Sequence, residues 1–215
     1  MVRHTLTYNG TNLKQFGVYV SGENSWAKSA PEFERVSVPG RNGDLVTYNK
    51  RFANVDIEYH LGIVKNFNEN FSNLVSFLHA DPGYHKLVDS SHPDVYRMAL
   101  IEQNIDPEMT WGNREGTFDV IFNCKPQVYL TSGDTTTTFT SSGSITNPTS
   151  FASKPLLRVY GTGNLTVGGK TININTNNSY IDIDCELEDA FRGSVNCNAN
   201  ISLNSVSCCP EYLPG

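Results

Sequence analysis

The sequence predicts a mainly β protein of two domains, with a single α-helix in the first. Hydrophobic residues make up 38% of the chain and charged residues only 18%, a composition typical of strands joined by polar turns. Short segments of alternating apolar and polar residues recur between Gly, Pro and Asn turn signals. The chain has 215 residues, which is enough for two compact domains with buried cores.

Strand patterns dominate the N-terminal half. Asn9-Gly10 separates strands predicted at residues 5–8 and 13–20, and this dipeptide is a strong hairpin signal. Residues 53–61 alternate cleanly, so that their apolar side chains share one face of a strand. The opposite face of that strand carries three polar residues: Asp56, Glu58 and His60.

One amphipathic helix follows. Its apolar residues recur at helical spacing, Asn66 or Asn68 is available as a cap, and Asp81-Pro82-Gly83 ends it. We expect this stripe to cover a sheet. Its members are Phe67, Phe71, Leu74, Val75 and Leu78. Further strands are predicted at residues 84–88, 96–104 and 116–124.

The composition changes sharply after residue 130. Residues 131–149 are almost entirely Thr, Ser and Gly and read as a connector. Beyond it, Gly168-Gly169 centres a hairpin, and short strands without a helix predict a β-sandwich. The predicted division is a first domain at residues 1–130, a connector at 131–149 and a sandwich at 150–215.

A further strand of the sandwich is predicted at residues 180–187. Its alternation places one set of residues inward, namely Ile181, Ile183, Cys185 and Leu187. The outward set is acidic and consists of Asp182, Asp184, Glu186 and Glu188. These acidic residues could instead be a pair of glycosidase carboxylates, or a calcium or glycan site. We interpret them as a strand face that contacts solvent or a partner.

The segment at residues 38–45 is the candidate binding element. Pro-Gly is a natural turn centre, and Asn-Gly directly after it also adopts left-handed conformations. Two turn signals in succession predict a shaped loop between strands at 33–38 and 45–48. The candidate interface residues are Pro39, Gly40, Arg41, Asn42, Gly43 and Asp44.

No pattern in the sequence points to catalysis. Gly-x-Ser-x-Gly, the P-loop and the dinucleotide fingerprint are absent, so we expect no enzyme and no cofactor. His79, His85 and His92 come from a helix end, a strand and a loop, which disfavours a metal site. The five cysteines are odd in number and lack a Cys-x-x-Cys clip, so we expect free thiols.

The charge and hydropathy of the chain disfavour two classes of partner, nucleic acids and membranes. The net charge of −6 argues against a general nucleic-acid-binding surface. No apolar segment approaches membrane-spanning length, and the N-terminus opens directly into a strand pattern. We therefore expect no signal peptide and no membrane anchor, with synthesis in the cytosol.

The order of several motifs resembles the distal tail (Dit) proteins of long-tailed phages. In the first half these are Phe-Gly-Val-Tyr-Val at 16–20, Val-Pro-Gly-Arg-Asn-Gly-Asp-Leu at 38–45, the strand at 53–61 and the helix. In the second half they are Asn-Pro-Thr-Ser-Phe at 147–151, Lys-Pro-Leu-Leu-Arg-Val-Tyr-Gly at 154–161, Ile-Asp-Ile-Asp-Cys-Glu at 181–186 and Leu-Pro-Gly at 213–215. Together they cover most of the chain.

The resemblance implies a tail-tube-like first domain and a galectin-like sandwich. Dit proteins form hexameric rings at the virion tail tip, where they join the tail tube to tip and hub proteins and leave a channel for DNA. Receptor-binding proteins are further expected partners. We expect an acidic lumen with Asp44, Asp56 and Glu58 as candidates. Relatives continue into further strands, so we expect here either an abbreviated sandwich or a chain that was cut short.

Two other functions remain open at the sequence level. A tail-tube protein would lack the second sandwich, which separates it from a hub protein. A carbohydrate-binding module would show an exposed aromatic platform in that sandwich. Its few aromatic residues, notably Tyr160, Tyr180 and Phe191, disfavour this alternative.

Overall fold

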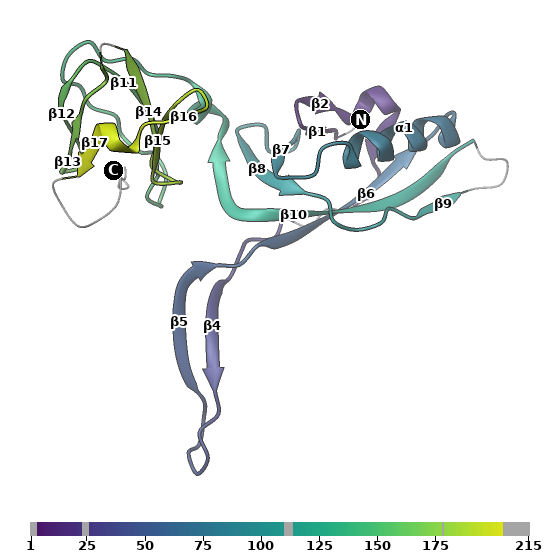
Figure 1. Ribbon diagram of the computed structural model, residues 1–215. Helices are drawn as coiled ribbons and strands as arrows, with labels where there is room; N and C mark the ends of the chain where they lie inside the picture. Colours follow the sequence, from purple (N-terminus) through teal and green to yellow (C-terminus); the bar gives the residue numbers. More distant parts are fainter. Residues whose placement is uncertain (1–3, 23–25, 110–113, 178, 204–215) are drawn as a thin grey trace. The chain divides into compact units, whose positions relative to one another are not determined.

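The computed structural model describes residues 4–22, 26–109, 114–177 and 179–203 (Figure 1). The chain divides between Thr137 and Thr138 into two compact units, which we describe separately. Cys208, Cys209 and the Leu-Pro-Gly motif at 213–215 lie outside the described residues. Within the described ranges, no helix is long and apolar enough to cross a membrane.

The first unit is built on an eight-stranded sheet that curls around the single α-helix of the described chain (Figure 1). The strand order is β2-β1-β7-β8-β10-β6-β3, and β9 pairs with β10. The elements are β1 (Leu6–Tyr8), β2 (Thr11–Asn12), β3 (Val18–Val20), β6 (Val55–Ile63), α1 (Phe67–His79), β7 (His85–Asp89), β8 (Val95–Leu100), β9 (Pro107–Met109) and β10 (Gly116–Leu130).

The core of this unit lies between α1 and one face of the sheet. β6 and β10 pair antiparallel from Gly116 opposite Ile63 to Cys124 opposite Val55. Alternate residues of both strands point toward the helix, as the sequence predicts for residues 53–61. The fully buried side chains include Ile57, Tyr59, Leu61, Phe67, Leu74, Phe118 and Phe122.

The predicted helix is confirmed, but its predicted cap is not. Asn66 occupies the N-cap position in a left-handed conformation with φ of 51°, and its side chain makes no capping hydrogen bond. Phe67, Leu74 and Leu78 are buried, as the apolar stripe predicts. The helix ends at His79, and the C-cap residue Ala80 connects it to the Asp-Pro-Gly turn.

The strand predicted at residues 13–20 is wrong in its first half. A 3-10 turn, η1 (Leu13–Phe16), intervenes because Asn12 Oδ1 accepts a hydrogen bond from the Lys14 amide at 2.9 Å. Gly17 then adopts φ of 72°, which closes the turn and directs the chain into β3. The strand predicted at 96–104 ends at Leu100, and β9 was not predicted.

The end of the first unit lies beyond the predicted boundary at residue 130. The 3-10 turn η2 (Thr131–Asp134) follows β10 directly. The Asp134 carboxylate accepts hydrogen bonds from Lys86 Nζ and, at 2.7 Å, from the Tyr96 hydroxyl. These contacts attach the start of the Thr-rich segment to the sheet.

The second unit is a sandwich of two small sheets, which confirms the predicted fold class. One sheet has the order β11 (Leu156–Tyr160), β14 (Tyr180–Asp184), β15 (Asp189–Arg192), β16 (Val195–Asn196). The other has the order β12 (Gly163–Val167), β13 (Lys170–Ile174), β17 (Ile201–Leu203). Ile172 and Ile174 of one sheet share a core with Ile181 and Ile183 of the other.

The alternation predicted for residues 180–187 holds only as far as Cys185. The strand ends at Asp184, whose Oδ1 accepts hydrogen bonds from the Glu186 and Leu187 amides and starts a turn. Leu187 was predicted to point inward, but it is 71% exposed as a consequence of this turn. Cys124 and Cys197 are buried free thiols, and Cys185 is buried as well.

Candidate assembly surfaces

A long β-hairpin is the most exposed element of the first unit. β4 (Pro31–Val36) and β5 (Leu45–Phe52) pair only with each other among the described strands. Every residue of β5 is exposed, as are five of the six residues of β4. In Figure 1 the hairpin extends from the end of β6, away from the sheet of the same unit.

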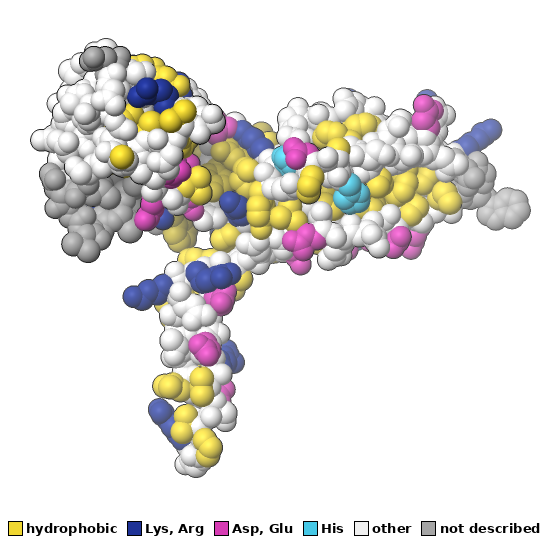
Figure 2. Space-filling view, in the orientation of Figure 1, with side chains coloured by type: hydrophobic (Ala, Val, Ile, Leu, Met, Phe, Trp, Pro, Cys, Tyr) yellow, Lys and Arg dark blue, Asp and Glu magenta, His cyan; other side chains and the backbone are white. Residues whose placement is uncertain are grey.

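The two faces of this hairpin differ in chemistry. Cross-strand pairing places Phe33 opposite Tyr48, with ring centroids 5.4 Å apart, and Arg35 opposite Val46. Pro31 and Phe52 extend this face toward the sheet after a register shift. We call this set the apolar hairpin face; its exposed members include Phe33 at 50%, Val46 at 54% and Tyr48 at 44% (Figure 2 shows hydrophobic side chains along the hairpin).

The other hairpin face is polar near the sheet. Arg51 Nε lies 3.0 Å from Glu32 Oε2, and the Asn49 amide donates a hydrogen bond to Glu32 Oε1. Thr47 is paired with Glu34 on this same face. The hairpin is therefore amphipathic near the sheet, whereas toward the tip Val36 and Leu45 add exposed apolar side chains to the second face as well. Neither face is covered within its own unit.

The tip of the hairpin contains the predicted interface residues. The Arg41 amide donates a hydrogen bond to the Val38 carbonyl at 3.2 Å, and Gly40 has φ of 78°. This is the turn predicted from Pro39-Gly40, because a type II turn requires positive φ at its third residue. Gly43 adopts φ of 83°, and residues 39–44 are all exposed.

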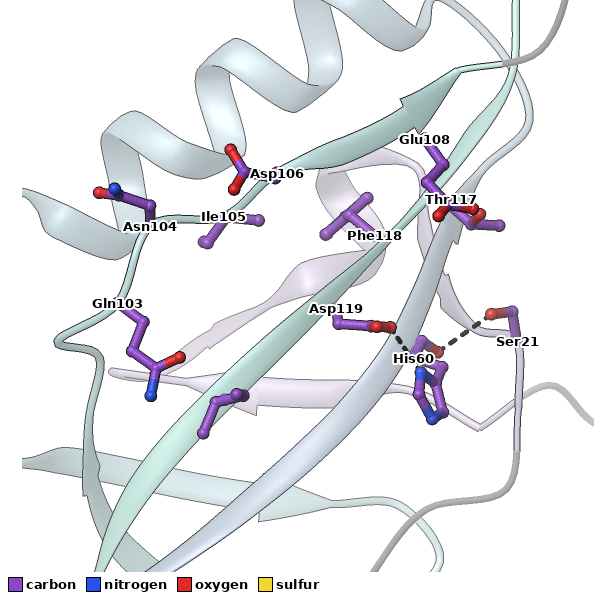
Figure 3. A pocket seen from close by; sticks show the side chains of 11 residues that line it. Ser21, His60, Gln103, Asn104, Ile105, Asp106, Glu108, Thr117, Phe118 and Asp119 are labelled. Carbon is purple, nitrogen blue, oxygen red and sulfur yellow. Dashed lines mark hydrogen bonds and ion pairs between the residues drawn. The ribbon is translucent and has the colours of Figure 1, made fainter.

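A second polar surface lies on the sheet face opposite α1. Asp56, Glu58 and His60 of β6 are directed there, and Asp119 of β10 pairs across from His60. The His60 Nδ1 atom lies 2.5 Å from Asp119 Oδ1 (Figure 3). This hydrogen bond, with the charges of Asp119 and Glu58, raises the pKa of His60.

The side chains of Glu58, His60 and Asp119 form a compact cluster. One potential ligand atom from each lies within 4.8 Å of the others. All three are exposed, and exposed acidic clusters are common without a bound ion, so the cluster alone does not define a metal site. The sequence identified Glu58 and His60 as neighbours but missed Asp119, because 59 residues separate it from His60.

An open pocket of about 460 Å³ adjoins this cluster. Figure 3 shows His60 and Asp119 on one side and Gln103, Asn104 and Asp106 on the other. The lining is mixed, with acidic and amide side chains around Ile105 and Phe118. It belongs to the same acidic face of the sheet.

The predicted lumen residues fall into two separate places. Asp56 and Glu58 share the sheet face with Asp119, and Asn123 donates a hydrogen bond to Asp56 at 2.8 Å. Asp44 lies at the hairpin tip, one strand away. A strand of that length extends about 26 Å, so Asp44 is not part of the same cluster.

The hydrogen bond from Lys86 lowers the pKa of Asp134, whereas two further shifts in the first unit arise mainly from burial. Burial raises the pKa of Tyr59, whose hydroxyl donates a hydrogen bond to Asp89. Burial also raises the pKa of Cys124 to about 11, which leaves its thiol protonated and unreactive at neutral pH. These groups stabilise a core and face no pocket that the described residues form.

An exposed apolar surface such as the apolar hairpin face is a common feature of protein-interaction sites. No protein-family model matches the sequence, and no curated protein does. Among solved structures, the chain is similar to the Dit protein of phage SPP1, described as a paradigm of the hub adsorption apparatus of phages that infect Gram-positive bacteria. The TM-score is 0.71 at 15% identity, over 98% of this chain and 90% of that protein. The fold is therefore that of Dit.

Proposed function

We propose that this protein is a structural hub of a phage tail. In this proposal, copies of the chain form a ring, expected to be hexameric, at the distal end of the tail tube. The ring joins the tube protein above to tip and hub proteins below, contacts receptor-binding proteins, and leaves a channel for DNA. The protein is made in the host cytoplasm and resides at the virion tail tip. The Dit fold supports this proposal.

The amphipathic hairpin is the observation that carries the assembly role. A two-stranded hairpin is marginally stable alone, and burial of its apolar face against another chain would lower the free energy of the hairpin. Phe33, Val46 and Tyr48 remain about half exposed in the single chain. A second copy of the chain in a ring would cover them. The predicted interface residues 39–44 lie at the tip, where they would extend this contact.

The second sandwich favours a hub protein over a tail-tube protein. A tube protein would lack strands equivalent to β11–β17, whereas the match to the Dit structure spans 98% of the chain. We retain the division into a ring-forming domain at 1–130, a connector at 131–149 and a sandwich at 150–215 as part of the proposal.

Two neighbouring substitutions test the role of the hairpin. Val46→Lys places a charge on the apolar hairpin face, and Thr47→Lys places the same charge on the polar face. Native mass spectrometry of the full chain should show rings for the wild type and Thr47→Lys, and monomers for Val46→Lys. Both residues are exposed, so thermal unfolding should be unchanged.

Two results would contradict the assembly role. One is equal assembly of both lysine variants, which would mean that the apolar hairpin face is not an interface. The other is a wild type that stays monomeric at high concentration and also when tail-tube protein is supplied as a template.

A further inference from the structure

We propose that the outer face of the β11–β14–β15 sheet binds a sugar ring of a glycan. The site is formed by Tyr160, Tyr180 and Phe191 around an Arg158–Asp182 pair, and we call it the tyrosine platform. The proposal goes beyond the hub function and does not depend on ring formation, because every residue involved lies within the second unit.

Sheet register brings the three aromatic residues together. Tyr160 of β11 pairs with Tyr180 of β14, and Arg158 pairs with Asp182. Asp182 in turn pairs with Phe191 of β15. Residues that are scattered between positions 158 and 191 of the sequence therefore lie on one face, opposite the core side chains Ile181 and Ile183.

The platform presents aromatic surface to solvent. Tyr160 is 72% exposed, and its ring centroid lies 5.9 Å from that of Tyr180 at an angle of 49°. The exposed ring of Tyr160 is the surface against which a flat ligand can stack, and Tyr180 supports it from the neighbouring strand. The C–H face of a pyranose can stack in this way, and its hydroxyl groups need polar partners at the edge of the rings.

The Arg158–Asp182 pair supplies rigid polar partners. Arg158 Nε and Nη2 donate to the two carboxylate oxygens of Asp182 at 2.6 and 2.8 Å. The guanidinium also lies over the Tyr180 ring, 4.5 Å from its centroid. The Asp182 side chain is 7% exposed and that of Arg158 is 54% exposed, so the buried acid holds the guanidinium in place at the surface. A cation fixed in this way can donate to ligand hydroxyls without losing side-chain entropy on binding.

A small pocket lies next to Tyr160, at the turn between β11 and β12. It has a volume of about 160 Å³ and is lined by Tyr160, Thr162, Asn164 and the glycines between them, and by the apolar side chains of Val159, Leu165 and Ile174. Nothing lies within 4 Å of where a Cβ on Gly161 or Gly163 would be, so the rim of the pocket is open. Its volume equals about five waters, which suits one ring-sized group and is small for a drug-sized ligand.

The surrounding charge favours a neutral ligand over an anionic one. Asp184 and Asp189 pair with each other on the same face of the sheet, next to Asp182. Their carboxylates would repel a phosphate or a uronate. Arg158 is already neutralised by Asp182. Arg192, which lies 6.0 Å from the Tyr180 ring and donates to the Tyr180 and Thr176 carbonyls, is therefore the second cation here against three carboxylates. A neutral glycan matches the combination of stacking surface and hydrogen-bonding groups.

Saturation-transfer NMR on the full chain tests the platform. The probes are the methyl glycosides of glucose, galactose, rhamnose and N-acetylglucosamine, with glycerol phosphate as the anionic probe. We expect at least one neutral glycoside to receive saturation, strongest at its ring C–H protons. Tyr160→Ala should weaken that binding by about tenfold or more, and Tyr160→Phe should retain it because the ring remains. Tyr160 is exposed, so both variants should fold.

The control is Leu187→Ala, which removes an equally exposed apolar side chain from a turn of the same unit and should leave binding unchanged. Three results would overturn the proposal: no glycoside binds, Tyr160→Ala binds as well as the wild type, or only glycerol phosphate binds. If no glycoside bound and Tyr160→Ala removed a protein partner from assembled tails, the tyrosine platform would be a protein-binding surface and not a glycan site. None of these results bears on the Val46→Lys test of the hub function.

Discussion

Gly116 lies where β10 begins, beneath the helix. A Cβ at this position would lie 2.6 Å from the Phe67 ring and 2.8 Å from the Glu108 carbonyl oxygen. Phe67 is 1% exposed and β9 is paired to β10, so neither neighbour can move freely. The close approach of ring, strand and backbone at this point requires the absence of a side chain.

Gly116→Ala should therefore destabilise the first unit. Overpacking of this kind costs about 1–3 kcal/mol, which chemical denaturation would show as a lower midpoint. Gly133→Ala is the matched control, because nothing lies within 4 Å of the added Cβ and its φ is not in the left-handed region. Its effect should stay within about 0.5 kcal/mol. Equal stability of Gly116→Ala and the wild type would show that the helix and β9 can separate.

The His60–Asp119 hydrogen bond should make the stability of the first unit depend on pH. It raises the pKa of His60, and since the raised value belongs to the folded state, the interaction stabilises the fold below the ordinary histidine pKa of 6.5. The stabilisation is lost as pH rises through the folded-state pKa. NMR titration of the His60 ring should give a value above 6.5, and Asp119→Asn should lower it.

Glu58→Gln is the comparison for this titration, because Glu58 acts on His60 only through its charge. It should lower the pKa of His60 by less than Asp119→Asn does. An unchanged value in Asp119→Asn would mean that the hydrogen bond is not formed in solution.

The β4–β5 hairpin is an element that the fold of its own unit does not need. The Ala53 amide donates a hydrogen bond to the Ala30 carbonyl at 3.3 Å, so the two ends of the hairpin lie side by side. Between them, nearly all residues are exposed. Burial of apolar surface, the main source of stability, is therefore almost absent along the hairpin.

Replacing residues 32–51 with a short Gly-Ser turn should separate folding from assembly. We expect the unfolding midpoint of the first unit to stay near that of the wild type, since the hairpin buries little. Ring formation in native mass spectrometry should be lost. A large fall in the unfolding midpoint would show that the hairpin packs on its own unit, and persistence of rings would place the interface elsewhere.

The elements differ in how far the sequence could predict them. The turn at Pro39-Gly40 and the amphipathic helix are confirmed, because both depend on residues close together in the chain. The 3-10 turn at Leu13–Phe16 was missed, since an Asn12 side chain that competes with the strand leaves no periodic signal.

Sites that depend on strand pairing were not predictable from one sequence. Asp182 was expected on a solvated face, but it is 5% exposed because Arg158 from the neighbouring strand covers it. His60 and Asp119 meet only because β6 and β10 pair in one register.

The same holds for the aromatic residues of the second unit. Their small number in the sequence disfavours a platform, whereas strand pairing places Tyr160, Tyr180 and Phe191 on one face. Each of these contacts follows from register, which alternation alone does not fix.

For the whole molecule, the proposed ring places one requirement on the sheet. DNA that passes through a channel must not adhere to its wall, and basic walls bind phosphates through counterion release. The chain carries a net charge of −6, and the face opposite α1 displays Asp56, Glu58 and Asp119. We propose that this face lines the lumen, with the helix directed outward. Asp44 is separated from it by the length of β5 and is the weaker lumen candidate.

A matched pair of charge reversals tests this orientation. Glu58→Lys changes the sheet face, and Glu69→Lys makes the same change on α1, on the opposite side of the sheet. Because a closed ring repeats each lysine around its axis, Glu58→Lys rings should retain short duplex DNA in a mobility-shift assay, and added salt should release it. Wild-type and Glu69→Lys rings should leave the DNA free. Equal retention by both variants, or retention by the wild type, would show that the acidic sheet face does not line the channel.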